Sequence, residues 1–332
     1  MIETDFTRLV GVKHPILLAP MGGAVSHALA VAVANAGAFA MFGASWHTPD
    51  RLRQQIADFR AATAAPFAIN LCLEWDQNER LAIALDSGAP IISLFWGDPT
   101  HYMPIIHAAG AKALVTVGSA DEARRAADLG ADAIVAQGIE AGGHVWSKVG
   151  TMVLVPAVVD AADGVPVIAA GGIADGRGIA AALALGASGA WIGTRFLATT
   201  ESDTSDDYKQ RLVRARETDT VYTELFDLDW PRAPHRVIRN STYDRWVAAG
   251  SPASGKRPGE GEPVIQQADG TVLKRYSDDT PKPGATGDLE AACHYAGQST
   301  GLVHDVLPAG DLVRRLVAET EAQLSHLRNL TD

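Results

Sequence analysis

One histidine of this chain lies at the end of a glycine-rich segment that directly follows a short apolar run. Residues 133–136 are apolar, which is typical of a buried strand, and residues 137–144 continue as Gln-Gly-Ile-Glu-Ala-Gly-Gly-His. Glycines allow the backbone to pass close to a ligand or to adopt a positive φ. An imidazole, whose ordinary pKa is about 6.5, can take a proton near neutral pH. The pattern indicates that His144 is a base beside a bound planar molecule; the alternative is a tight turn with a surface histidine.

Composition argues against several classes of protein. The chain has 332 residues, 47% of them hydrophobic, and a formal net charge of −11 from 28 Lys and Arg against 39 Asp and Glu. It has no basic run, which argues against a nucleic-acid surface. Cys72 and Cys293 are far apart and form no Cys-x-x-Cys pattern, so we expect neither a disulfide framework nor a metal site. No signal peptide or membrane span is recognisable, so we expect a cytoplasmic protein without a membrane partner.

The elements that would position His144 are short apolar segments that alternate with helical patterns. These segments are apolar on both faces, as parallel strands covered by helices must be. No Gly-x-Gly-x-x-Gly follows the first of them, which argues against a Rossmann-type sheet. The alternation predicts an α/β fold, a (β/α)8 TIM barrel, over residues 1–200. The predicted strands are 15–20, 38–42, 66–71, 90–95, 112–117, 132–137, 166–170 and 188–192.

The composition and the hydrophobic pattern of the sequence change after residue 200. Residues 221–290 are rich in Pro, Gly and charged residues, which predicts an irregular or partly helical segment. Residues 311–327 have the apolar spacing of an amphipathic closing helix. We therefore predict a barrel domain from residues 1–200 and 295–328, interrupted by residues 201–294, which we call the insertion. Two roles for the insertion stay open: a lid over the barrel mouth, or a mobile decoration.

Two glycine-bearing loops predict a phosphate site. Active sites of TIM barrels lie at the C-terminal ends of the strands, and phosphate often binds after the seventh and eighth strands. Here those loops are 170–178 and 191–196. Backbone N–H groups in such turns can receive a phosphate dianion, and the Thr194 hydroxyl would add a donor. The alternative is two ordinary turns, and Arg177 and Arg195 are either phosphate partners or surface charges.

Several separate patches together resemble the FMN-dependent nitronate monooxygenases, formerly called 2-nitropropane dioxygenases. The most specific patch is the string at 137–144, whereas the first patch and the Gly-Thr-Arg patch are shared more widely among FMN barrels. The similarity covers roughly residues 10–200 and 295–310. The matching patches are 19–23 (Ala-Pro-Met-Gly-Gly), 67–70 (Phe-Ala-Ile-Asn), 137–144, 169–173 (Ala-Ala-Gly-Gly-Ile), 192–197 (Ile-Gly-Thr-Arg-Phe-Leu) and 296–301 (Ala-Gly-Gln-Ser-Thr-Gly).

The resemblance implies an FMN site with one catalytic base. His144 matches the family's base, and Asn70 would hydrogen-bond the flavin. Met21 and Gly22 would approach the flavin ring, while the glycines after the last two strands would hold the phosphate. The implied cofactor-binding residues are Ala19, Pro20, Met21, Gly22, Asn70, Gln137, Gly142, Gly143, Gly171, Gly172, Trp191, Ile192, Gly193 and Thr194.

The resemblance also implies a reaction. In this family a nitronate gives one electron to FMN, oxygen captures the organic radical, and a carbonyl compound and nitrite result. The expected partners are therefore a nitronate or nitroalkane and O2, and the use of NAD(P)H stays open. Two alternatives remain. One is an FMN-dependent NAD(P)H oxidoreductase that reduces a quinone or an enoyl thioester. The other is a barrel that binds a phosphorylated ligand without turnover.

For some residues both a role in the site and an ordinary packing or surface role are open. Better-known family members often have Arg-Gly directly after the histidine, whereas residues 145–150 here read Val-Trp-Ser-Lys-Val-Gly and include Trp146 and Lys148. They either face the substrate or lie on the surface of the loop, and this departure puts the substrate in doubt. A site role and an ordinary packing or surface role are likewise both open for His47, Cys72, Trp75, Trp96 and His101.

Overall fold

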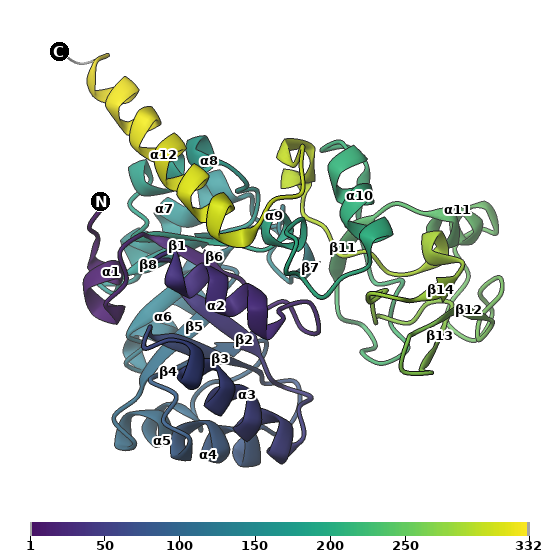
Figure 1. Ribbon diagram of the computed structural model, residues 1–332, viewed down its shortest axis with the longest axis horizontal. Coiled ribbons are helices and arrows are strands. Elements are labelled where there is room, and N and C mark those ends of the chain that lie inside the picture. The colour runs from purple at the N-terminus through teal and green to yellow at the C-terminus, as the bar shows by residue number, and fades with distance from the viewer. Residues whose placement is uncertain (1, 331–332) are drawn as a thin grey trace.

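Eight parallel strands form a barrel in the computed structural model, which describes residues 2–330 (Figure 1). The strands are β1 (Ile16–Leu18), β2 (Ala40–Gly43), β3 (Phe67–Cys72), β4 (Ile91–Phe95), β5 (Lys112–Val117), β6 (Ala133–Gln137), β8 (Val167–Ala170) and β9 (Gly189–Ile192). Their order is β1-β9-β8-β6-β5-β4-β3-β2, and a parallel bridge between Leu17 and Phe39 closes the row. The predicted TIM barrel is confirmed.

Helices surround the barrel. They are α1 (Asp5–Val10), α2 (His27–Asn35), α3 (Pro49–Ala62), α4 (Asn78–Asp86), α5 (Met103–Ala108), α6 (Ala120–Asp128), α7 (Thr151–Ala161), α8 (Gly176–Ala184), α9 (Thr194–Leu197) and α12 (Ala309–Arg328). Side-chain oxygens of Ser26, Thr48, Ser119 and Asp175 accept first-turn N–H groups and so begin α2, α3, α6 and α8. Because α9 is only one turn long, α12 occupies the place beside α8 and α2.

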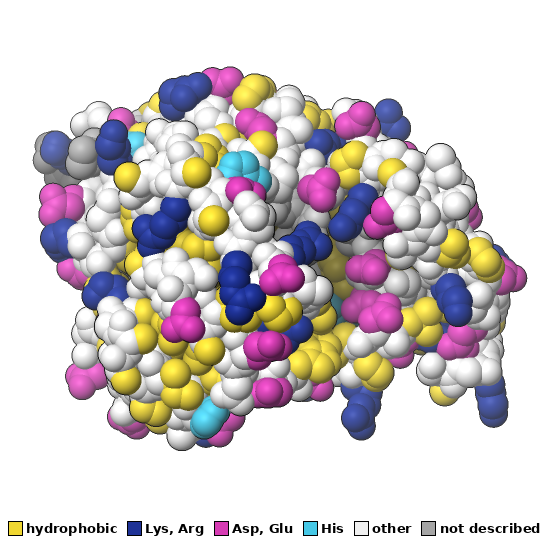
Figure 2. Space-filling view, turned by 60° about the horizontal axis from the view of Figure 1, so that its bottom comes forward, with side chains coloured by type: hydrophobic (Ala, Val, Ile, Leu, Met, Phe, Trp, Pro, Cys, Tyr) yellow, Lys and Arg dark blue, Asp and Glu magenta, His cyan; other side chains and the backbone are white. Residues whose placement is uncertain are grey.

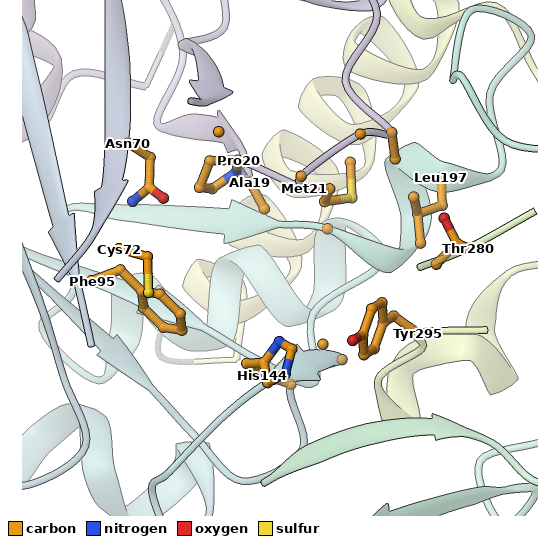
Figure 3. Close-up of a pocket in the computed structure, with 18 of the residues that line it drawn as sticks. Ala19, Pro20, Met21, Asn70, Cys72, Phe95, His144, Leu197, Thr280 and Tyr295 are labelled. Atoms are coloured by element: carbon orange, nitrogen blue, oxygen red, sulfur yellow. The ribbon is translucent and has the colours of Figure 1, made fainter. Parts of the chain in front are cut away.

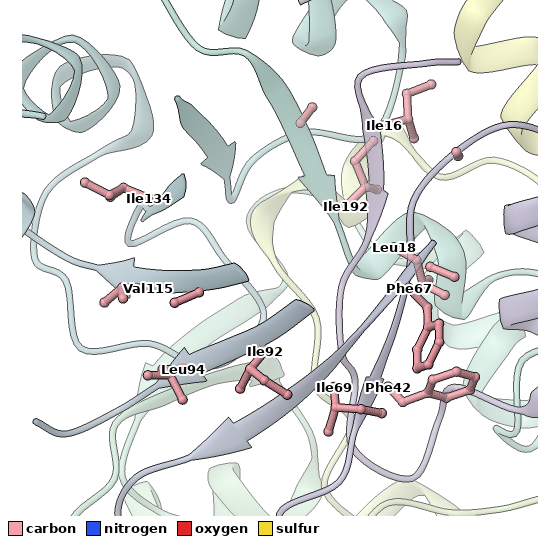
Figure 4. Close-up of a cluster of buried hydrophobic side chains, with 14 of the residues drawn as sticks. Ile16, Leu18, Phe42, Phe67, Ile69, Ile92, Leu94, Val115, Ile134 and Ile192 are labelled. Atoms are coloured by element: carbon pink, nitrogen blue, oxygen red, sulfur yellow. The ribbon is translucent and has the colours of Figure 1, made fainter. Parts of the chain in front are cut away.

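Two apolar layers stabilise the barrel. Inward-facing side chains such as Leu17 fill its interior. Helix α1 closes the end at which the strands begin, where Phe6 packs edge-on against Phe39 with 5.5 Å between ring centroids. Outward-facing side chains such as Ile16 and Ile92 pack beneath the helices (Figure 4). Burial on both faces explains why these strands show no polar alternation in the sequence.

The insertion contains more strand than the sequence pattern predicts. It has helices α10 (Asp206–Arg214) and α11 (Ser241–Ala248), but also strands of two antiparallel three-stranded sheets. One sheet consists of β10 (Thr220–Thr223), β11 (His235–Ile238) and β7 (Gly143–His144), and the other of β12 (Pro263–Gln266), β13 (Val272–Lys274) and β14 (Thr286–Gly287). The prediction of an irregular or partly helical segment missed these strands, because two to four residues are too few to display an alternating pattern. Since β7 lies in the barrel loop after β6, the first sheet joins the insertion to that loop (Figure 1).

The closing helix α12 lies tightly against α8. A methyl group at Gly176 would stand 2.3 Å from Cβ of Glu319 and 2.4 Å from the backbone nitrogen of Thr320. The carboxylate of Glu319 accepts a hydrogen bond of 3.0 Å from the Gly176 N–H. The two helices therefore meet only because residue 176 has no side chain. No helix within residues 2–330 is long and apolar enough to cross a membrane.

We predict that Gly176→Ala lowers the free energy of unfolding by about 1–3 kcal/mol, as overpacking typically does. Urea or thermal unfolding would measure this loss. Gly310→Ala in α12 is the matched control, because a methyl group there would meet no atom nearer than 3.6 Å. Equal stability of the two variants would contradict the close approach of α8 and α12.

Candidate active site

The C-terminal ends of the barrel strands and the insertion together line a cavity of about 570 Å³. Figure 2 shows a hollow in this face of the molecule, with hydrophobic side chains inside and charged side chains around the rim. Almost every residue predicted to hold a cofactor or act as the base contributes to the lining. These are Ala19, Pro20, Met21, Gly22, Asn70, Gln137, Gly142, Gly143, His144, Gly171, Gly172, Trp191, Gly193 and Thr194.

Ile192 is the one predicted site residue that does not line the cavity. Its side chain is 1% exposed and packs in the layer between the strands and the helices. Because successive side chains of a strand point to opposite faces, Trp191 faces inward and Ile192 outward. The carbonyl oxygen of Ile192 accepts a hydrogen bond of 2.9 Å from the Ala19 N–H. The roles of the remaining residues toward a cofactor stay predictions.

Some of the residues for which a site role and a packing or surface role were both open line the cavity, and the others lie outside its lining. His47 and Cys72 line the cavity. Burial, helped by the charge of Arg51, lowers the pKa of His47 to about 4. Burial raises the pKa of the Cys72 thiol to about 12, so it stays protonated. The residues outside the lining are Trp75, Trp96, His101, Trp146 and Lys148.

Aromatic rings enclose His144. Its imidazole is stacked on Trp230, with 4.1 Å between centroids and 32° between the planes. Tyr295 and His235 lie at 5.4 and 5.3 Å, and Trp96 stands edge-on at 6.1 Å. The Nε2 atom is buried and has no hydrogen-bond partner among the described residues. In Figure 3, His144 and Tyr295 lie on the side of the cavity opposite Pro20 and Met21.

The environment of His144 keeps its ring neutral. Burial lowers its pKa well below 6.5, and positive charge on His235 would lower it further. Burial also lowers the pKa of His235, to about 4. Both imidazoles are therefore uncharged at neutral pH. A neutral ring in a cavity is a proton acceptor, which is the state that a base requires.

Two amide side chains present hydrogen-bonding atoms to the cavity. Asn70 donates from Nδ2 to Oγ of Ser93 at 3.0 Å, which leaves its Oδ1 atom for a ligand. Gln137 donates from Nε2 to the carbonyl oxygen of His144 at 3.2 Å. Its Oε1 atom is buried without a partner. A buried acceptor without a donor is costly, so this atom indicates that a ligand N–H belongs there.

The two loops predicted to bind phosphate both open into the cavity. Gly171 and Gly172 have φ values of +99° and +73°, a conformation that favours glycine. Among the described residues, no hydrogen bond uses the N–H of Gly171, Gly172 or Gly193 as its donor. The Thr194 hydroxyl accepts a bond of 2.9 Å from the Gly297 N–H, which leaves its own proton free to donate. These groups form a set of donors suited to an anion.

The two arginines of these loops are not part of that set. Arg195 is buried outside the cavity, where it pairs with Asp305 and donates to the carbonyl oxygen of Ala198 at 3.2 Å. Arg177 is exposed and pairs with Asp175, the N-cap of α8. An anion in the cavity would therefore meet backbone N–H groups and the Thr194 hydroxyl at this end.

Sequence reasoning missed the residues that the insertion and the segment after it contribute. Trp230, Asp229 and Asp278 come from the insertion, and Tyr295 follows it. Burial, together with a hydrogen bond that the protonated Asp278 donates to the Asp229 carboxylate, raises the pKa of Asp278 to about 8, so this carboxyl pair holds a proton at neutral pH. Tyr295 lies next to the 296–301 patch, which was a usable signal. No local pattern marks Trp230.

Comparisons with known proteins agree with this site. The profile of the family described as nitronate monooxygenase matches residues 3–80 and 74–319. A nitronate monooxygenase of Paraburkholderia phytofirmans is 31% identical over 98% of this chain and 97% of its own. A (3aS,4S,5R,7aS)-5-hydroxy-7a-methyl-1-oxo-octahydro-1H-indene-4-carboxyl-CoA dehydrogenase of Mycobacterium tuberculosis is 32% identical over 98% of both chains.

A solved structure shares the whole architecture. FabK from Thermotoga maritima superimposes with a TM-score of 0.83 and 33% identity, covering 99% of this chain and 100% of its own. The insertion is thus included in the alignment. On the profile match and these full-length similarities, the chain belongs to the nitronate monooxygenase family, a family of flavin-dependent oxidoreductases.

Proposed function

We propose that this protein oxidises alkyl nitronates or nitroalkanes with O2, using FMN as its flavin and His144 as the general base. The observation that carries the proposal is the neutral imidazole of His144, whose Nε2 atom is buried and which lines the same cavity as the two glycine loops. The products are a carbonyl compound and nitrite. The chain belongs to a family of oxidoreductases, which argues against a barrel that binds a phosphorylated ligand without turnover.

The cavity fits a flavin mononucleotide. Its volume of about 570 Å³ lies within the usual range for ligand sites, about 300–1,000 Å³. The unpaired Oε1 of Gln137 suits an N–H at the edge of a planar ring. The N–H groups of Gly171, Gly172 and Gly193 suit a phosphate. When bound, FMN would supply the one-electron oxidation of the nitronate, for which this chain offers no group of its own.

The chain's own contribution is proton removal. A nitroalkane is a carbon acid, and its deprotonation needs a base within hydrogen-bond reach. Proton uptake creates an imidazolium, which burial of His144 disfavours. The nitronate formed beside it carries the opposite charge, so the two charges arise together as a pair. The rings of Trp230 and Tyr295 lie against the imidazole and limit the access of water to it.

A second candidate is an NAD(P)H-dependent reductase that acts on an enoyl thioester or a quinone. The observation in its favour is the match over 98% of both chains to a relative named as a carboxyl-CoA dehydrogenase. The same flavin-binding groups would serve both reactions. The two candidates differ in what reduces the flavin, so kinetics with and without oxygen separate them.

The first experiment is aerobic turnover of ethyl nitronate and 2-nitropropane by the FMN-loaded protein. We expect nitrite to appear in step with oxygen loss, as a monooxygenase reaction requires. Nitrite would be determined colorimetrically and oxygen with an electrode. A yellow, folded protein that releases no nitrite would overturn the proposal. Rapid anaerobic bleaching by NADH or NADPH would then support the reductase.

Replacement of His144 should slow turnover of a neutral nitroalkane more than turnover of a pre-formed nitronate. We predict that His144→Ala binds FMN but loses about 100-fold or more in kcat/KM for neutral 2-nitropropane, since general bases contribute about 10²–10⁴-fold. Turnover of pre-formed nitronate should fall much less, because its proton is already gone. His101→Ala, which alters a histidine outside the cavity, is the control. Equal losses on both substrates would remove the base role.

The pH dependence should follow the lowered pKa of His144. A base works only while unprotonated. We therefore expect kcat/KM for a neutral nitroalkane to stay constant as the pH falls through 6.5, the ordinary pKa of histidine. The rate should be lost only as the pH falls through the pKa of the buried ring. Initial rates in overlapping buffers would measure this acid limb. A limb centred at or above 6.5 would show that His144 is not buried in the working enzyme.

A further inference from the structure

Trp230 lies where the insertion meets the barrel. It belongs to the connection between β10 and β11, and only 4% of its surface is exposed. It belongs to an apolar cluster with Cys72, at the end of β3, and Phe95, at the end of β4, packs against this cluster. It also lines the cavity, although it comes from outside the barrel. The insertion is thus attached to the barrel rim through a side chain of the active site.

The contact between Trp230 and His144 is a stacked one. The two centroids are 4.1 Å apart, the shortest ring-to-ring distance in the described part of the chain, and the planes differ by 32°. On its other sides, Trp230 contacts Trp75 at 4.8 Å and Trp96 at 4.9 Å. Its own position is therefore fixed by rings that belong to the barrel loops. A fixed indole plane limits rotation of the imidazole that lies against it.

The insertion also fixes the backbone of His144. In the β7–β11 pair, His144 lies opposite His235 and Gly143 opposite Arg236. The N–H of Val145 donates to the carbonyl oxygen of Pro234 at 3.0 Å. The barrel loop that carries His144 is thus held as an edge strand by the insertion. Backbone pairing places the residue, whereas the orientation of its side chain depends on the rings around it, of which Trp230 is the nearest.

We infer that Trp230 is a positioning residue for His144: its indole holds the imidazole plane in one orientation and covers it from water. The inference rests on the proposed function, in which His144 is the base. It assigns the insertion a part in catalysis, because the covering ring comes from residues 201–294. The side chain contacts the base and is assigned no proton of its own.

The test compares Trp230→Phe with Trp230→Leu. Phenylalanine keeps a flat ring against the imidazole, whereas leucine keeps apolar volume without a plane. We expect Trp230→Leu to lose about tenfold or more in kcat/KM for neutral 2-nitropropane, since misplacement of a catalytic group by about 1 Å can cost about 100-fold. Trp230→Phe should recover most of the loss, and in Trp230→Leu turnover of pre-formed nitronate should fall much less than turnover of the neutral substrate.

A control separates positioning from general damage to the insertion. Trp246 also lies in the insertion, is half-buried, and does not line the cavity. Trp246→Leu makes the same chemical change and should leave turnover of both substrates unchanged. If Trp230→Leu loses neutral nitroalkane and nitronate turnover equally, or if Trp230→Phe recovers nothing, the positioning role is wrong.

A direct titration keeps the inference testable if the proposed reaction fails. NMR signals of the His144 ring, assigned by their loss in His144→Ala, would report its pKa with no substrate present. Burial lowers this pKa, so admission of water in Trp230→Leu should raise it toward about 6.5. An unchanged pKa would overturn the covering role of Trp230. Failure of nitrite release with a raised pKa would instead remove only the nitronate reaction.

Discussion

The structure depends on one place where two backbone segments lie in direct contact. Residues 140–142, in the loop after β6, lie directly on residues 296–298, where the chain returns from the insertion. A methyl group at Gly142 would stand 2.4 Å from the Gly297 nitrogen, and one at Gly297 would stand 2.6 Å from the Glu140 carbonyl oxygen. The N–H of Gln298 donates to that carbonyl at 2.9 Å. Neither position 142 nor position 297 can carry a side chain at this crossing.

That crossing brings three distant parts of the chain to one place. The Gly297 N–H donates to the Thr194 hydroxyl at the end of β9, and Tyr295, two residues earlier, faces His144. The insertion must therefore leave and rejoin the barrel over the cavity. Its strand β11 then pairs with β7, which places Trp230 against His144. The position of the insertion follows from the returning segment and from this pairing.

The electrostatics of the cavity differ from one end to the other. Backbone N–H groups of the glycine loops face one end, and no arginine of those loops joins them. At the insertion, Asp229 and Asp278 share a proton, and burial keeps His144 and His235 neutral. Neutral imidazoles suit the proton removal that we propose for His144.

The sequence by itself determined the barrel and identified many of the residues that line its cavity. Apolar runs gave each strand, and the string at 137–144 marked His144, because both signals lie within a few neighbouring residues. Only the tertiary structure decided what the insertion does. Strands of two residues show no alternation, and stacking of Trp230 on His144 joins positions 86 residues apart (230 − 144). It likewise decided that Ile192 points outward, that Arg195 pairs with Asp305, and that Trp146 donates to Glu122. Such contacts depend on which distant surfaces meet, and a local pattern carries no information about that.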